Sequence, residues 1–190
     1  MSKRIFYVTI NDNVEGMQAI SLVKRPAVEV DFLCFDEQKP VQLNFNDEER
    51  VITGVVCLAD VPIYRYTQGF GEWWCVFTKD VIKEMVVKYS KDGLFNSVNL
   101  QHNDDKYVDG VYLFESYLIN KDRGICPTEF ADIPEGSWIC SFKVENEDVW
   151  NEIKEGQTLK GFSLEIMCDL IEKKTNDLDE IDDLINEILE

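Results

Sequence analysis

The sequence predicts an α+β domain in which short strands form a barrel or sandwich flanked by helices. Most of the chain consists of short apolar runs with a period of two, separated by turn residues. This spacing is typical of antiparallel β folds and differs from an alternation of strands and helices. Two other segments carry apolar residues at helical spacing. With 190 residues, 45% of them hydrophobic, the chain can form one main domain that buries roughly 70% of its unfolded surface.

The strand predictions rest on alternation of apolar and polar side chains. In residues 28–34, Val28, Val30, Phe32 and Cys34 occupy every second position, as in a half-buried strand. Similar runs occupy residues 5–10, 51–58, 73–77, 96–102, 111–119, 137–144 and 161–167.

Two helices are predicted from apolar stripes and end signals. The first follows Thr78, a suitable N-cap, and ends at Lys91-Asp92-Gly93. The second runs from about Asn146 to Glu155, with Gly156 after its last turn. The apolar faces are formed by Val81, Ile82, Met85, Val86 and Tyr89 in the first helix and by Val149, Trp150 and Ile153 in the second.

Residues 176–190 have a different residue pattern from the rest of the chain, and this pattern predicts an acidic amphipathic helix. The aliphatic residues Leu178, Ile181, Ile185 and Ile188 are spaced by 3, 4 and 3, and the segment has seven acidic residues and no basic one. A helix of about 15 residues is marginal in water, so it would pack on its own domain or bind a partner. We therefore expect a barrel domain over residues 1–170 and an acidic helix or tail over 171–190.

Charge and composition exclude several classes of function. The formal net charge is −18, which argues against a free-standing nucleic-acid binder because phosphate recognition needs a basic face. No window approaches the roughly 20 apolar residues that cross a bilayer, and the start lacks signal-peptide features. We expect a soluble protein made in the cytoplasm, with no membrane partner.

No cofactor or metal is expected. One histidine and six widely spaced cysteines give no zinc site of the usual kinds. The phosphate-binding motifs GxxxxGK[ST] and GxGxxG are absent from the sequence. The cysteines are interpreted as reduced, mostly buried thiols, and any Ser-His or Cys-His mechanism within one chain must use His102.

Two candidate residues lie on neighbouring predicted strands. His102 continues the apolar face of Val98 and Leu100, which is a common place for a structural histidine as well as for a catalytic one. Glu115 is the only charged residue on its strand face, and a buried carboxylate needs a partner. That partner is His102 if the strands pair as a hairpin; alternatively Glu115 reaches water, Arg65 or Arg123.

Ser163 is the candidate nucleophile. It lies two residues after Gly161, which lets a substrate or another backbone approach closely, although Glu165 replaces the second glycine of a GxSxG elbow. A serine hydroxyl becomes a good nucleophile when a base takes its proton and a third group orients that base. Ser163, His102 and an acid supply these residue types, and a merely structural serine is the alternative.

Seven short segments between residues 20 and 167 carry a resemblance when they are taken in order. They are Ile20 to Ala27, Asp60 to Arg65, Asn99 to His102, Gly110 to Ser116, Gly136 to Trp138, Val149 to Gly156 and Gly161 to Glu165. Together they resemble the prohead proteases of tailed bacteriophages, the serine endopeptidases that mature the capsid, and more distantly the herpesvirus assemblins.

The resemblance implies an assemblin-like, mainly antiparallel β-barrel flanked by helices, with His102 as general base and Ser163 as nucleophile. The third member varies in such enzymes. Glu115 is favoured by the buried-carboxylate argument, and Glu165 and Asp104 are the alternatives. Glu165 is two residues from Ser163, roughly 7 Å along a strand, which we expect to place it beside the nucleophile and not behind the histidine.

The implied substrates are scaffold and capsid proteins inside the immature prohead, in the host cytoplasm. A homodimer is a possible active form, and no nucleic acid, membrane or cofactor is implied. The alternative is a non-catalytic capsid- or scaffold-associated protein that keeps the protease fold.

Three further features have alternative interpretations. The basic pair Lys24-Arg25 precedes Pro26, and a structural turn is favoured over a substrate or oxyanion role. One of Trp73 and Trp74 is expected to be buried and the other to lie on a rim. The segment from Pro62 to Gly71 is expected to be a mobile loop that forms one wall of the cleft.

Overall fold

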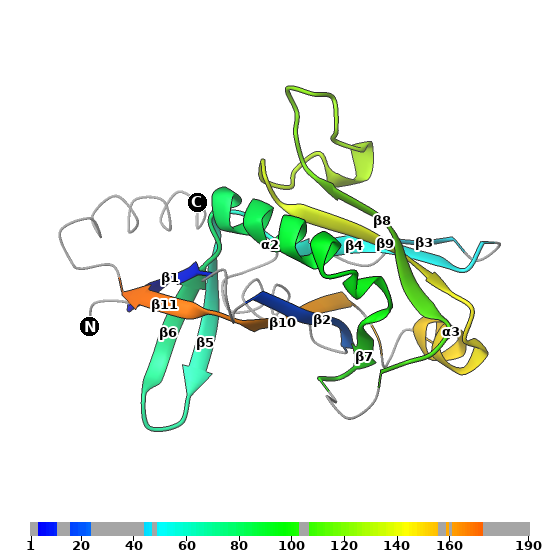
Figure 1. Ribbon diagram of the computed structural model, residues 1–190, viewed down its shortest axis with the longest axis horizontal. Coiled ribbons are helices and arrows are strands. Elements are labelled where there is room, and N and C mark those ends of the chain that lie inside the picture. Colours follow the sequence, from blue (N-terminus) through cyan, green and yellow to red (C-terminus); the bar gives the residue numbers. More distant parts are fainter. Residues whose placement is uncertain are drawn as a thin grey trace.

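The computed structural model describes residues 4–10, 16–23, 44–46, 49–102, 107–155, 159 and 161–172. In these residues strands predominate and form three sheets, with two α-helices beside them (Figure 1). The α+β class is therefore confirmed. None of the three sheets closes on itself in the described residues, so the barrel is not confirmed.

The first sheet has the strand order β11-β1-β6-β5. Strand β1 pairs with β11 antiparallel and with β6 parallel, and β5 and β6 form a hairpin. In Figure 1 this hairpin extends away from the rest of the fold. The bounds are Ile5–Thr9 for β1, Pro62–Thr67 for β5, Gly71–Val76 for β6 and Asp169–Glu172 for β11.

The second sheet has the order β10-β2-β7 and holds the candidate site. Its strands are Gly16–Val23 (β2), Val98–Leu100 (β7) and Gly161–Met167 (β10). The central strand β2 pairs antiparallel with β10 and parallel with β7. Segments far apart in the sequence thus become neighbours on one sheet.

The third sheet has the order β3-β4-β9-β8, with antiparallel pairs throughout. Irregular registers between Val55 and Cys57 in β4 and between Leu113 and Glu115 in β8 mark β-bulges. The bounds are Asn44–Asn46 for β3, Val51–Cys57 for β4, Val111–Leu118 for β8 and Trp138–Val144 for β9.

Both predicted helices are present; the first begins after the predicted cap Thr78 and the second begins one residue after its predicted start at Asn146. In α2, Lys79–Lys91, the Thr78 hydroxyl accepts a hydrogen bond from the Val81 amide, and Gly93 follows in the left-handed conformation. In α3, Glu147–Lys154, the Asn146 side chain accepts from the Val149 amide. Short 3-10 turns occupy Leu94–Asn96 and Thr128–Phe130.

The core lies where the second and third sheets and the two helices meet. Phe162 of β10 packs on Phe142 of β9 with ring centroids 4.9 Å apart. Trp138 of β9 contacts Tyr89 of α2 edge-on at 5.4 Å. All four rings are almost completely buried. This packing holds one face of β10 against the third sheet, which leaves its other face for polar groups.

Several predicted segments differ from the structure or lie outside it. Residues 62–71, expected to be a mobile loop, instead form strand β5 and the turn into β6. The predicted strand over 28–34 and the acidic helix over 176–190 lie outside the described residues. Strand β11 crosses the predicted domain boundary after residue 170, and that division stays a prediction.

Candidate active site

Two serine side chains and one asparagine side chain form a row across the second sheet. Ser163 of β10 is directly opposite Ser21 of β2, and Ser21 is opposite Asn99 of β7. Ser21 and Asn99 are completely buried, while Ser163 is 9% exposed. Directly opposite residues have Cβ atoms about 4.5–5.5 Å apart, so this register brings residues from three distant segments into one polar row.

Glu165 joins this row because it lies two residues from Ser163 on β10, and residues i and i+2 share a face. Its Oε1 atom accepts hydrogen bonds from Ser21 Oγ at 2.6 Å and from Asn99 Nδ2 at 2.7 Å. Ser21 Oγ is also 2.6 Å from Asn99 Oδ1. The two completely buried members of the row, Ser21 and Asn99, are therefore hydrogen-bonded, as most buried polar groups are.

His102 reaches the same carboxylate from a turn after β7. Strand β7 ends at Leu100, and both Gln101 and His102 are left-handed, with φ of 55° and 57°. His102 Nδ1 is 3.1 Å from Glu165 Oε1 and 3.2 Å from Ser21 Oγ. The expected alternation, with His102 on the Leu100 face, is therefore wrong: the left-handed turn brings the imidazole to the face of Asn99.

The electrostatics of the cluster favour an ionised Glu165. Partial burial by itself would raise the pKa of this carboxyl group, but hydrogen bonds from Ser21, Asn99 and His102, together with attraction to His102, lower the pKa below its ordinary value of 4.5. The Glu165 side chain is 13% exposed and that of His102 is 47% exposed. A carboxylate held in this way fixes the orientation of an imidazole that remains open to solvent.

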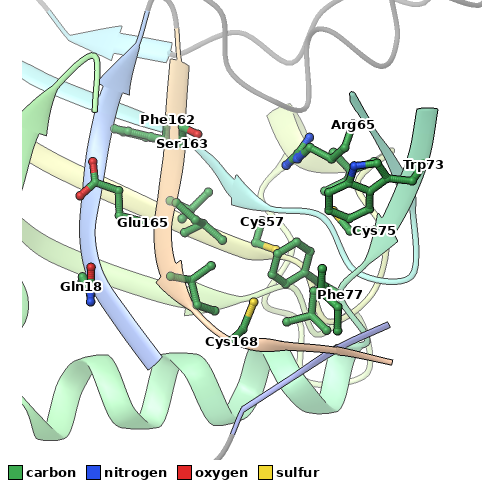
Figure 2. A pocket seen from close by; sticks show the side chains of 16 residues that line it. Gln18, Cys57, Arg65, Trp73, Cys75, Phe77, Phe162, Ser163, Glu165 and Cys168 are labelled. Atoms are coloured by element: carbon green, nitrogen blue, oxygen red, sulfur yellow. The ribbon is translucent and has the colours of Figure 1, made fainter. Parts of the chain in front are cut away.

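Ser163 and Glu165 also line a cavity of about 400 Å³ between the second sheet and the β5–β6 hairpin. Figure 2 shows Ser163 on β10 at one side of this cavity, and Arg65 and Trp73 on the hairpin at the other side. The Arg65 guanidinium points from β5 toward β10. The cavity therefore has one serine within reach of solvent, one cation and largely apolar walls.

A comparison with known protein families shows which family the chain belongs to. The family model described as "Putative phage serine protease XkdF" matches residues 40–172, which is well over half of the chain. The chain belongs to this family. No curated protein and no solved structure matches the chain. The predicted relationship to phage serine proteases is therefore confirmed.

The XkdF-family match contains His102, Ser163 and Glu165 but begins after Ser21. Among the hydrogen bonds of the described residues, none joins Ser163 to His102. The nearest connection runs through Ser21, which is opposite Ser163 and contacts His102 Nδ1. In enzymes without substrate, catalytic hydrogen bonds are often long or poorly aligned.

Glu115 lies elsewhere in this XkdF-family fold. The bulge after Leu113 changes the alternation of β8, so Glu115 is exposed and not buried. Its Oε2 atom accepts a hydrogen bond of 2.6 Å from Ser141 Oγ in the third sheet. The burial argument that favoured Glu115 was therefore wrong. Glu165, which was expected not to support the histidine, is the acid in contact with His102.

Other sequence candidates are placed as follows. Asp104 and the Lys24-Arg25 pair lie outside the described residues. Trp73 and Trp74 are both partly buried, so the expected division into one buried and one rim ring is wrong. The hairpin that carries them does form a wall of the cavity, although as strands.

Thiols also line the cavity, and they are candidate nucleophiles there besides Ser163. Burial raises the pKa of the Cys57 thiol, nearby Cys75 raises it further, and Arg65 opposes both effects. A thiol that stays protonated is a poor nucleophile. The five described cysteines form no disulfide with one another.

Sequence reasoning missed Ser21 and Asn99 as members of the site. Each is a small polar residue between apolar neighbours, Ile20 and Leu22 in one case and Val98 and Leu100 in the other. Such residues on buried strands need polar partners, and this pattern was the available signal. Within the described part of the chain no group of three metal-ligating side chains is found, and no helix there is long and apolar enough to span a bilayer.

Proposed function

We propose that this protein is a serine endopeptidase that cleaves scaffold and capsid proteins inside the immature phage prohead. Ser163 is the nucleophile, His102 the general base and Glu165 the acid that orients the histidine. Membership of a phage serine protease family supports the chemistry. The proposed assemblin relationship and substrates rest on the resemblance of the segments from Ile20 to Glu165.

The observation that carries the proposal is the pairing of His102 with Glu165 on the strand of Ser163. An ionised Glu165 that accepts a hydrogen bond from Nδ1–H holds the imidazole in the tautomer with its lone pair on Nε2. Nε2 is then the atom that receives the serine proton. A charged histidine formed during the reaction is stabilised by the same carboxylate.

The reaction proceeds in two halves. Ser163 Oγ attacks the carbonyl carbon of the scissile peptide while its proton passes to His102 Nε2, and this proton then goes to the leaving amine as the C–N bond breaks. Water attacks the resulting ester, giving one proton to His102, which returns it to Ser163 Oγ as the carboxylic product leaves. Such general-base assistance contributes about 100- to 10,000-fold to the rate.

Ser21 has a supporting role in this mechanism. Its hydroxyl lies 3.2 Å from His102 Nδ1, but it is completely buried and does not line the cavity. A peptide carbonyl cannot reach it without opening the sheet. Ser21 instead donates to Glu165 and so helps to keep that carboxylate ionised.

A serine-directed fluorophosphonate probe tests these assignments. Labelling is expected in the wild type and in Ser21→Ala, and is expected to be lost in Ser163→Ala and His102→Ala, with circular dichroism checking that each variant is folded. Mass spectrometry of the labelled peptide identifies the modified serine. Labelling at Ser21, or labelling that survives Ser163→Ala, contradicts the proposal.

The substrate proposal needs a separate experiment. Co-expression of the protein with the scaffold and capsid proteins encoded by the same phage should give fragments that are absent with Ser163→Ala. A wild type that neither labels nor produces such fragments would instead support the alternative, a non-catalytic capsid- or scaffold-associated protein. Sedimentation of the active sample would show whether cleavage coincides with a homodimer.

A further inference from the structure

The guanidinium of Arg65 is an unusual group in the wall of the cavity. Arg65 is partly buried, and the one hydrogen bond that the described residues give it runs from Nη1 to the Tyr64 carbonyl at 2.8 Å. Within the described part of the chain, no carboxylate lies within 4.0 Å of it. The acidic residues in the described segments thus leave this cation without an ion-pair partner.

The surroundings of Arg65 make an anion favourable at this point. Its neighbours along the cavity wall include Cys57, Ile63 and Phe77, which are buried and offer little polar compensation for the charge. Charge-assisted hydrogen bonds are stronger in such partly dehydrated surroundings than in water. Among the described residues, the four guanidinium N–H groups other than the one on the Tyr64 carbonyl have no acceptor, and they can bind a planar carboxylate.

The carboxylate of Glu165 does not occupy this position, although it lines the same cavity. It is engaged by Ser21, Asn99 and His102. Figure 2 shows it beside β2, on the opposite side of β10 from Arg65. The cavity therefore has a polar catalytic side and a cationic side, with Ser163 between them.

We infer that Arg65 selects an acidic side chain of the substrate next to the scissile bond. This inference rests on the proposed protease function and names its substrate class: peptides with glutamate or aspartate within a few residues of the cleaved bond. A cavity of about 400 Å³ accommodates one such side chain with its methylene groups against the apolar wall. Trp73, directly opposite Arg65 in the hairpin, closes the outer side of this subsite.

A peptide library derived from a digested proteome tests the inference. Ser163-dependent cleavage sites of the wild type are expected to be enriched in glutamate and aspartate at one position beside the cut. A pair of synthetic peptides with Glu or Gln at that position should then differ in kcat/KM by about 10- to 100-fold, the range expected of a charge-assisted hydrogen bond.

Variants of Arg65 identify the residue responsible. In Arg65→Gln the ratio of kcat/KM for the Glu peptide to that for the Gln peptide should fall to about 1, and in Arg65→Lys most of the preference should remain. In Arg65→Glu this ratio should fall below 1, and a peptide with Lys at that position should be cleaved in preference to the Glu peptide. Arg4→Gln is the matched control, because Arg4 lies over the exposed Phe70 ring at 4.7 Å, outside the cavity. It should keep the wild-type ratio.

The outcomes separate this inference from the proposed function. Ser163-dependent cleavage without acidic enrichment, or a ratio that Arg65→Gln leaves unchanged, overturns the inference and leaves the protease assignment intact. Absence of both cleavage and Ser163 labelling overturns the protease assignment, and the inference with it.

Discussion

At the residue scale, the site is organised around one oxygen atom of Glu165. Oε1 accepts from Ser21 and Asn99 and lies 3.1 Å from the histidine. The sequence could supply His102, Ser163 and Glu165 as candidates, because their chemistry is visible in their residue types. It could not decide between the acids, because a single bulge in β8 determines whether Glu115 faces the core or solvent.

Replacement of each acid gives the most direct comparison at this scale. Glu165→Gln should slow fluorophosphonate labelling of Ser163 by about 100-fold or more, since the histidine loses the carboxylate that selects its tautomer. Glu115→Gln should label within about 3-fold of the wild type, because Glu115 contacts Ser141 in another sheet. Time courses of labelling measure both rates, and the reverse order would return Glu115 to the site.

The pH dependence of stability follows from the depressed pKa of Glu165. Because the folded pKa lies below the ordinary 4.5, the stabilisation by ionised Glu165 is present above the unfolded pKa and is lost as pH falls through the folded one. The free energy of unfolding of the wild type minus that of Glu165→Gln should therefore decrease as the pH is lowered from about 5 to about 3. Urea titrations at several pH values measure it, and a difference that is constant over this range contradicts the assignment.

At the element scale, the turn after β7 matters most for the site. Two consecutive left-handed residues, Gln101 and His102, are uncommon outside glycine and occur where the surrounding structure enforces them. Alternation over residues 96–102 predicted a continuous strand, and no residue type in this segment signals the turn. Tertiary contacts of His102 with β10 and β2 supply the reason for it.

Substitution at Gln101 tests whether this turn positions the histidine. Gln101→Gly should retain wild-type stability and labelling, because glycine adopts a positive φ without strain. Gln101→Val should be about 1–2 kcal/mol less stable than Gln101→Gly, because a β-branched residue fits the left-handed region poorly. Thermal unfolding and labelling rates measure both effects. Equal stability of the two variants would show that the turn does not require a positive φ.

Prediction of the elements succeeded where the local pattern was sufficient. The Thr78 cap, the helix start near Asn146 and the alternation in β1, β4, β8, β9 and β10 were visible in the sequence. Strands β2, β3, β5 and β11 were not predicted as strands. In β2, residues Ala19 to Val23 are buried on both faces, so this segment lacks the apolar–polar alternation on which the predictions relied. The site depends on β2, which explains why its composition was harder to predict than the fold class.

At the scale of the whole molecule, the net charge of −18 is the dominant property. Like charges on one compact surface repel one another and destabilise the folded state, and added salt screens this repulsion. The midpoint of thermal unfolding at pH 7 should therefore rise by about 2–5 °C between low and moderate NaCl concentration. Scanning calorimetry at several concentrations measures it, and sucrose at equal osmolality controls for exclusion effects. A midpoint that falls with NaCl would contradict this account.

The pairing of β2 with β10 has a consequence for biosynthesis. Ser21 emerges from the ribosome long before Ser163, so the nascent chain carries half of the polar row while β10 is still being translated. Contacts between such distant segments form late and slowly. The proposed protease therefore lacks both Ser163 and Glu165 until translation has passed β10, so neighbouring polypeptides meet no complete site before that point.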